Sequence, residues 1–120
     1  MNKLKDSSIE SLLSDYAQAA ALHGETTWNG DYDTANFNYE VLAAIYRELR
    51  ARGRGAQLCL LPLLKNSNPD VRGWAASHAL EFAPEHGVPV LEDLSHSGGL
   101  PGFSAEMTLK EWRKGTLKFP

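Results

Sequence analysis

The sequence predicts an all-α fold, and three observations support this prediction. Apolar residues recur three or four positions apart in several segments, which is the spacing of one helix face. These segments are separated by typical helix caps and stops, such as Asn68-Pro69 and Gly53. No run of strand length alternates apolar and polar residues. The chain has 120 residues, of which 42% are hydrophobic and 22% charged, so we expect one globular domain over residues 1–120.

A first helix is expected over residues 8–23. Ser7 and Glu10 have the spacing of a capping box, in which each side chain satisfies a free backbone N–H of the other's turn. Gly24 stands where a helix-ending glycine belongs. The apolar positions between them have helical spacing and are Ile9, Leu12, Leu13, Tyr16 and Ala20.

A second helix is expected over residues 34–52. The preceding stretch Glu25–Asp33 is polar and predicts a loop, in which Asp33 or the adjacent Thr34 caps the helix. Gly53 follows the last turn as a stop. One apolar stripe, expected to face the core, contains Phe37, Val41, Leu42, Ile45 and Leu49.

Two further helices are expected in the middle of the chain. The segment 56–65 is apolar on nearly every side, and Pro62 within it argues against a central strand, so we expect a buried helix. Asn68 is a good N-cap and Pro69 suits the first helical position, which predicts a helix over residues 69–83.

The last third is expected to hold two more helices. Pro84 opens the first of them. The stretch Ser97–Phe103 is rich in glycine and proline and predicts a loop. The final helix has three expected landmarks, namely Ser104 as its cap, Met107 and Trp112 facing inward, and Gly115 just beyond its end.

The segment Leu63–Leu80 resembles the centre of a HEAT repeat, in which two antiparallel helices meet at a turn. The matching residues are the pair Val71-Arg72 and the run Ala75-Ala76-Ser77-His78-Ala79-Leu80. The family pattern has an aspartate where this chain has Asn66, which can make the turn-capping hydrogen bond but not the charge interaction with Arg72. The resemblance implies a short HEAT-like or armadillo-like α-solenoid of about five or six helices.

The whole chain is also similar to a bacterial family, domain of unknown function two-zero-one-nine. The similarity covers an early Leu-Leu helix and four later motifs, which are Leu49-Arg50-Ala51-Arg52-Gly53, Leu61-Pro62-Leu63-Leu64, Asn68-Pro69-Asp70-Val71-Arg72 and Met107-Thr108-Leu109 to Gly115. The family implies an armadillo/HEAT-like fold and assigns no catalytic residue.

The residues that could carry chemistry do not form a recognisable catalytic or metal-binding pattern. Cys59 lies in an apolar run and is expected to be a buried packing residue rather than a nucleophile. The segment Asp31–Asp33 lacks the glycine and distal glutamate of a calcium loop. The four histidines, His23, His78, His86 and His96, lack zinc-site spacing. We therefore expect no catalytic residue, no metal, no cofactor and no enzymatic activity.

The sequence also predicts a cytoplasmic protein. Met1–Ser8 carries positive charge without a following apolar segment, so we expect no signal peptide. The longest apolar run, Leu58–Leu64, is far shorter than the ~20 residues that cross a bilayer, so we expect no membrane partner. One cysteine excludes an internal disulfide.

Charge is distributed unevenly along the chain, whose net charge is −3. Four arginines crowd the end of the second expected helix, where the helix dipole and solvation account for them: Arg47, Arg50, Arg52 and Arg54. An acidic chain binds nucleic acid poorly, so we do not expect that partner. Residues 73–106, here named the acidic segment, contain five carboxylates and no lysine or arginine. They can face a basic partner or can simply be a solvated acidic face.

Trp74 is the most informative residue of the acidic segment. The helix expected over 69–83 has two adjacent apolar stripes, one of Val71, Ala75, Ala79 and Phe82 and one of Ala76, Leu80 and Ala83. Both stripes miss position 74, which places the indole on the other face with His78, Glu81 and Glu85. A tryptophan surrounded by carboxylates is a good interface anchor. The alternative is that a further helix or the C-terminal tail covers it. We interpret Trp74, His78, Glu81 and Glu85 as candidate partner-binding residues.

These observations favour a non-enzymatic protein-binding module. Its sharpest version is an immunity protein that uses the acidic face to block a basic bacterial toxin. The alternative is a regulatory or scaffold subunit that acts by self-association or by binding several partners. An enzyme is the least supported class, because no convergent acid–base pair, metal set or nucleophile is present.

Overall fold

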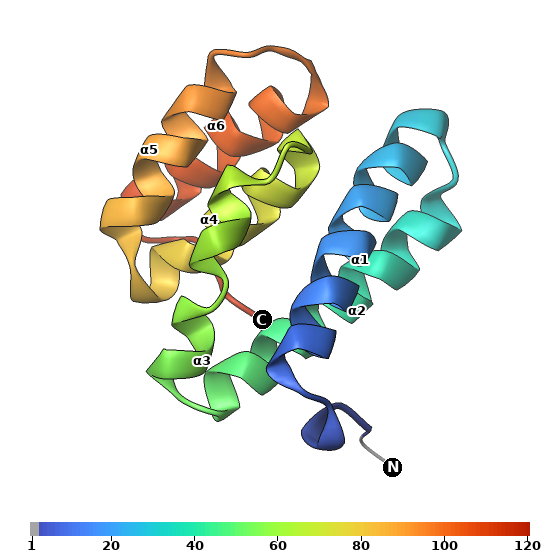
Figure 1. Cartoon of the computed structure of the whole chain (residues 1–120). Helices are drawn as coiled ribbons and strands as arrows, with labels where there is room; N and C mark the ends of the chain where they lie inside the picture. Colours follow the sequence, from blue (N-terminus) through green and yellow to red (C-terminus); the bar gives the residue numbers. More distant parts are fainter. Residues whose placement is uncertain (1–2) are drawn as a thin grey trace. The chain divides into compact units, whose positions relative to one another are not determined.

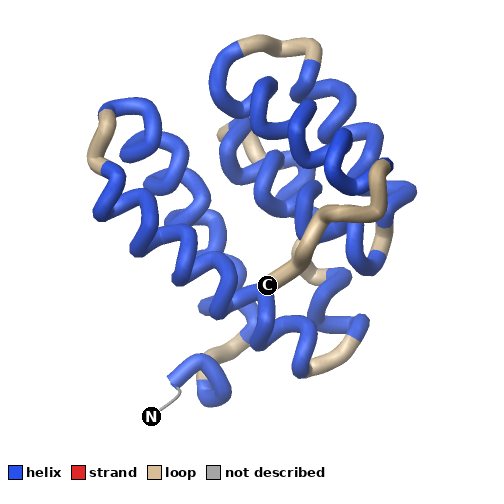
Figure 2. Tube along the Cα trace, turned by 180° about the vertical axis from the view of Figure 1, so that it is seen from behind, coloured by secondary structure: helices blue, strands red, loops and turns tan. Residues whose placement is uncertain are grey.

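A computed structural model describes residues 3–120, and it is all-helical as the sequence predicts. Figure 1 shows the helices by label, and Figure 2 shows that they alternate with loops only, without a strand in this range. We expect no signal peptide from the segment Met1–Ser8, and the first two residues of that segment, Met1 and Asn2, lie outside the described residues. The chain divides into an N-terminal unit, which ends at Leu60 but also includes Pro120, and a C-terminal unit, Leu61–Phe119.

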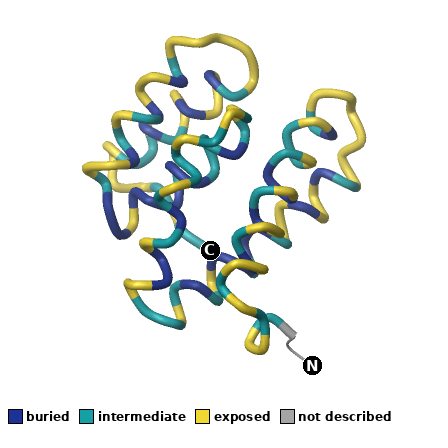
Figure 3. The backbone as a smooth tube through the Cα atoms, viewed as in Figure 1, coloured by how far each residue is buried: buried dark blue, intermediate teal, exposed yellow. Residues whose placement is uncertain are grey.

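The N-terminal unit is built on a hairpin of two long helices. Its elements are the 3-10 helix η1 (Lys3–Asp6) and the α-helices α1 (Ile9–Asn29), α2 (Tyr32–Ala51) and α3 (Arg54–Leu58). The inner faces of α1 and α2 bury large side chains without exposure, among them Leu12, Tyr16, Leu42, Tyr46 and Leu49. Figure 3 shows such buried positions recurring along both helices, as the apolar periodicity requires.

Helix α1 is longer than the sequence predicts, because Gly24 lies inside it and Gly30 ends it. Gly30 has a left-handed φ of 85°, which an L side chain rarely adopts. Beyond Gly24 the helix buries Thr26, whose hydroxyl donates a 2.7 Å hydrogen bond to the Leu22 carbonyl. Packing of this extra length against α2 outweighs the roughly 1 kcal/mol that an internal glycine costs. The expected loop Glu25–Asp33 is therefore wrong over most of its length.

Both N-caps of the hairpin differ from the predicted ones. Ser8, not Ser7, caps α1, and its hydroxyl accepts from the Ser11 N–H at 3.1 Å. Asp31, not Asp33 or Thr34, caps α2 and accepts from the Thr34 N–H at 3.3 Å. Neighbouring Ser or Asp residues offer the same chemistry, so the sequence defines the cap only to within one or two positions.

Polar groups buried in the hairpin have partners. The amide of Gln57, on α3, donates to the hydroxyl of Tyr46, on α2, at 3.0 Å, which ties the short helix to the long one. Tyr16 is fully buried. Burial, and to a lesser degree the neighbouring Tyr46, raises the pKa of the Tyr16 phenol well above its usual value. The hydroxyl therefore stays neutral, as an apolar core requires.

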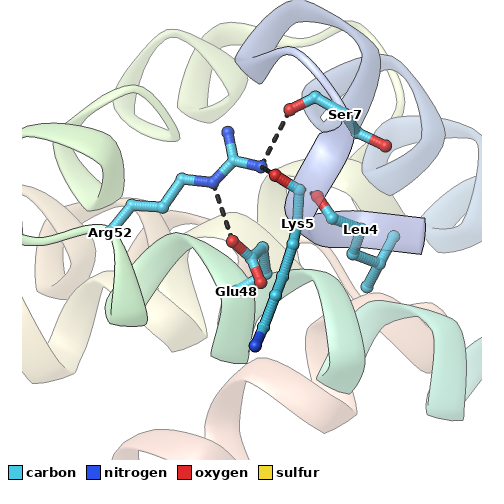
Figure 4. Close-up of polar contacts among 5 residues, drawn as sticks. All are labelled: Leu4, Lys5, Ser7, Glu48 and Arg52. Atoms are coloured by element: carbon cyan, nitrogen blue, oxygen red, sulfur yellow. Dashed lines mark hydrogen bonds and ion pairs between the residues drawn. The ribbon is translucent and has the colours of Figure 1, made fainter. Parts of the chain in front are cut away.

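Arg52 holds the start of the chain against the end of α2 (Figure 4). Its guanidinium donates to the carbonyls of Leu4 and Ser7, both at 2.8 Å, and to that of Lys5 at 3.3 Å. Its Nε also pairs with the Glu48 carboxylate at 2.8 Å. Dipole and solvation therefore do not fully account for this arginine, because it also donates to three backbone carbonyls in and just after η1.

We expect Arg52→Ala to lower the free energy of unfolding by about 1–2 kcal/mol, because several charge-assisted hydrogen bonds at a partly exposed site are lost. The side chain is 23% exposed, so solvent reduces the effect. Urea denaturation measures the change, and hydrogen exchange at the Ser7 amide, which bonds the Leu4 carbonyl, should accelerate. Arg47→Ala, at an exposed arginine of the same helix, is the control. Equal effects of the two substitutions would contradict the assigned role.

The C-terminal unit packs three helices around one apolar cluster. Its elements are the 3-10 helix η2 (Leu61–Lys65) and the α-helices α4 (Pro69–Phe82), α5 (Pro84–Ser95) and α6 (Gly99–Arg113). The buried cluster contains Ala76, Leu80, Leu91, Leu94, Ala105 and Leu109. Partly buried Trp112, Leu117 and Phe119 pack against it, so the tail after α6 contributes to this core.

The turn before α4 confirms the expected cap. Asn68 accepts from the Asp70 N–H at 2.8 Å, and Pro69 begins the helix. Asn66 makes a turn-capping hydrogen bond, in which its side-chain oxygen accepts from the Asn68 N–H at 2.9 Å. Arg72 donates to the Asn66 carbonyl at 2.7 Å. The arginine therefore stabilises the turn through the backbone, without the carboxylate of the HEAT pattern.

Two boundaries of the C-terminal half are wrong in the prediction. The helix expected over 56–65 divides into α3 and η2, with Cys59 and Leu60 between them. The loop expected over Ser97–Phe103 is mostly the first turn of α6, which Gly98 caps instead of Ser104.

Close packing explains why glycine stands in the first turn of α6. A Cβ on Gly102 would lie 2.8 Å from the Leu94 carbonyl, so the glycine there allows α5 and α6 to approach.

Met107, which the sequence predicts to face inward, is 42% exposed, and its neighbours Ala105 and Leu109 face the core instead.

Candidate protein-binding surface

Three of the four predicted partner-binding residues lie on α4, and the fourth, Glu85, lies on α5. Trp74 is half-buried, and its ring centroid lies 5.7 Å from that of His78, with the planes tilted by 49°. His78 is only 3% exposed, so its placement on an exposed face is wrong. The helical pattern identified the shared face of the two rings correctly but could not show that the face is covered at His78.

Glu81 and Glu85 are both exposed, but they lie on different helices. Helix α4 ends at Phe82, and Ala83 has the non-helical angles φ −154° and ψ 63°. The single face that the sequence pattern extends from Trp74 to Glu85 is therefore broken at this turn. Glu81 belongs to the last turn of α4 and Glu85 to the first turn of α5, where the helix dipole favours a carboxylate.

All five carboxylates of the acidic segment are exposed: Glu81, Glu85, Glu92, Asp93 and Glu106. Arg113, which lies beyond the segment, approaches Glu92 to 3.2 Å, and both side chains are about half exposed, at 54% and 53%. An ion pair this exposed is weak and screened by salt. The segment therefore contributes five exposed carboxylates and no lysine or arginine of its own to the surface.

A second surface, which the sequence interpretation missed, lies on the helical hairpin. Leu4 of η1 and side chains of α1 and α2 line a groove of about 400 Å³, here named the hairpin groove. Its apolar lining includes Ala19, Leu22, Phe37, Val41 and Ile45. The stripe expected to face the core is thus divided, because Leu42 and Leu49 are buried but Phe37 is 67% exposed. The signal was present in the width of the stripe, which exceeds what one buried face needs.

The described residues hold no group of three or more His, Cys, Asp or Glu side chains placed to bind a metal ion. Cys59 is half-buried rather than fully buried, and its thiol donates to the Gly55 carbonyl at 3.4 Å. His86 and His96 are exposed on and just after α5. Within residues 3–120, no helix is long and apolar enough to cross a membrane.

Comparison with known proteins defines the fold and leaves the activity open. No protein-family model matches the chain, and no curated protein matches it. Among solved structures, the chain is similar to the protein RPA1889 from Rhodopseudomonas palustris CGA009, with 26% sequence identity and a TM-score of 0.91. The match covers 100% of both chains. The all-helical fold is therefore shared with a protein seen in a crystal structure.

Proposed function

We propose that the chain is a non-enzymatic protein-binding module of the cytoplasm. We also propose that its helices form the short HEAT-like solenoid that the sequence resemblance implies. The observation that carries the proposal is the acidic segment, in which five exposed carboxylates stand without any lysine or arginine among them. Such a surface attracts a basic partner and repels acidic ones, so it favours both fast association and selectivity.

The sharpest form of the proposal is an immunity protein that neutralises a basic bacterial toxin. A toxin that acts on nucleic acid carries a positive surface for the phosphate backbone, and an acidic protein can occupy that surface. Trp74 is half-buried, so it can present an edge rather than its whole ring to such a partner. The binding energy in this form comes from Glu81 and Glu85, with Trp74 at the margin of the contact.

Charge reversal tests this form. Co-expression with the product of the adjacent upstream reading frame should relieve that neighbour's toxicity and yield a stoichiometric complex. Glu81→Lys with Glu85→Lys should weaken the complex at least about tenfold, mainly by slowing association, and the difference should shrink with added salt. The measurement is binding kinetics at several salt concentrations, together with circular dichroism to confirm that the variant folds.

The control makes the same change of net charge elsewhere. Asp6→Lys with Glu10→Lys alters two exposed carboxylates of the N-terminal unit and should leave binding within about twofold. Wild-type protection and affinity in the Glu81/Glu85 variant would refute the acidic-surface proposal.

A regulatory or scaffold subunit that self-associates is the second candidate. Its supporting observation is the tip of the hairpin, where Trp28 is 78% exposed and Tyr32 is 63% exposed on either side of Gly30. Large aromatic side chains are enriched at interfaces. Light scattering over a range of protein concentrations distinguishes the two, because self-association through this tip would produce a dimer that Trp28→Ser dissociates.

A further inference from the structure

The hairpin groove has the dimensions of a helix-binding site. Its lining spans residues 15–22 of α1 and 37–45 of α2, and each stretch corresponds to about two helical turns, or roughly 12 Å. A partner helix that lies along the groove would place apolar side chains at positions i, i+3 or i+4, and i+7 against it. The stretches that line the groove are therefore as long as about two turns of a partner helix.

The lining of the groove combines small and large side chains. Ala19 and Ala44 are small, whereas Leu22 and Phe37 are large and are 36% and 67% exposed. Val41 also lines the groove and is half-buried. A protein gains free energy by covering an apolar lining of this kind, because water is released from it.

Carboxylates border the apolar lining. Asp15 itself lines the groove, and Asp33 and Glu40 lie one helical turn before and after Phe37. Glu25 stands one turn beyond Leu22. All four carboxylates are exposed, and no lysine or arginine occurs between Asp6 and Tyr46. These carboxylates make the border of both helices mainly acidic, whereas Lys5 and Arg47, which are also exposed, stand beside the lining residues Leu4 and Ala44. The complementary occupant is therefore mainly basic.

We propose that the hairpin groove binds a basic amphipathic helix of a partner protein, with two turns of apolar side chains in the groove and lysine or arginine toward the carboxylates. The inference shares with the proposed function that the partner is a basic protein, but not the surface that binds it. It uses a surface of the N-terminal unit, so it can be tested independently of the acidic segment and of the immunity role.

Charge argues against a second copy of the hairpin as the occupant. A copy that docked by the same face would bring its own Asp15, Asp33 and Glu40 toward the carboxylates of the first. Like charges at an interface oppose association, and the carboxylates that border each groove outnumber the two cations beside it, Lys5 and Arg47. A basic helix has no such conflict.

Three synthetic helical peptides test the proposal against the full chain. Each has roughly 14 residues, or about four turns. The first places leucine at i, i+4, i+7 and i+11 and lysine on the other face, the second replaces the lysines with glutamate, and the third scrambles the leucine positions of the first. Fluorescence anisotropy measures affinity, and NMR amide shifts locate the site.

The expected result is binding of the first peptide, with shift changes confined to residues 15–22 and 37–45 and the neighbouring carboxylates. The glutamate and scrambled peptides should bind at least about tenfold more weakly, and salt should weaken the first peptide. Failure of the first peptide to bind, or equal binding of all three, would overturn the proposal.

Phe37→Lys should reduce affinity for the first peptide at least about tenfold, because it places a cation in the apolar lining and beside the peptide's lysines. Phe37 is so exposed that the fold should tolerate the change. Phe103→Lys, at a 53% exposed phenylalanine of α6, is the matched control and should bind normally.

Three outcomes of the variant measurements are informative. Equal affinities of the two phenylalanine variants would overturn the groove as the site. A wild-type dimer in light scattering that Phe37→Lys dissociates would assign the groove to a second copy instead. Glu81→Lys with Glu85→Lys should leave peptide affinity unchanged, so failure of the immunity role remains distinguishable from failure of the groove.

Discussion

Replacing Gly87 with alanine should lower the free energy of unfolding by about 2–3 kcal/mol. Gly87 lies in α5 where that helix crosses α4, and an added Cβ would be 2.6 Å from the Ala76 carbonyl oxygen. It would also lie 3.3 Å from side-chain atoms of Ala79 and Leu80. The closest obstacle is backbone, which cannot rotate away, so the helices must separate and loosen the core between them.

Helix propensity acts in the opposite direction and is too small to compensate. Alanine is favoured over glycine inside a helix by about 1 kcal/mol. Gly73→Ala, in α4, isolates this term, because its added Cβ would meet only Leu94 at an ordinary distance of 3.7 Å. Chemical denaturation should therefore find Gly73→Ala neutral or slightly stabilising and Gly87→Ala clearly destabilising. A Gly87→Ala protein as stable as Gly73→Ala would show that the two helices are not this closely packed.

Truncation of Leu91 should lower the free energy of unfolding by about 2–5 kcal/mol. Leu91 is fully buried in the cluster that joins α4, α5 and α6. Leu91→Ala removes apolar contact area and leaves a cavity that small neighbours such as Ala76 and Ala105 cannot fill. The free energy of unfolding of a typical domain is about 5–15 kcal/mol, so roughly a third of the stability can depend on this side chain.

Two further variants keep the Leu91 prediction testable if the alanine variant fails to fold. Leu91→Met nearly conserves volume and should cost less than about 1.5 kcal/mol. Leu100→Ala, at a 41% exposed leucine of α6, should change stability by less than about 0.5 kcal/mol. Urea denaturation followed by circular dichroism measures all three. If Leu100→Ala lowered the free energy of unfolding as much as Leu91→Ala, the assignment of Leu91 to the core would be contradicted.

Local sequence signals predicted the helices well where the signal was chemically specific. Asn68-Pro69 predicted both the start and the cap of α4, because few residue pairs suit an N-cap and a first helical position. Glycine was less reliable as a signal. Gly24 lies inside α1, and Gly102 allows close packing within α6, although each was interpreted as a stop or loop residue. A glycine serves turns and close contacts equally, and only the neighbouring helix distinguishes them.

The candidate sites were harder to predict than the helices. Periodicity showed correctly that Trp74 and His78 share a face, yet it could not show that His78 is buried. The same reasoning assigned Phe37 to the core with Leu42, although Phe37 is mostly exposed. A helical pattern defines directions around one axis, whereas exposure depends on which other segments cover each direction.

By itself, the sequence determined the all-helical class, the cap of α4 and the uneven charge, because each depends on residues that are close along the chain. Only the tertiary structure decided where α1 ends and α6 begins, which stripe residues are buried and that α1 and α2 leave a groove between them. These properties depend on contacts between residues far apart in sequence, where packing energies exceed local preferences. The acidic segment was therefore visible before folding, whereas the hairpin groove exists only in the folded chain.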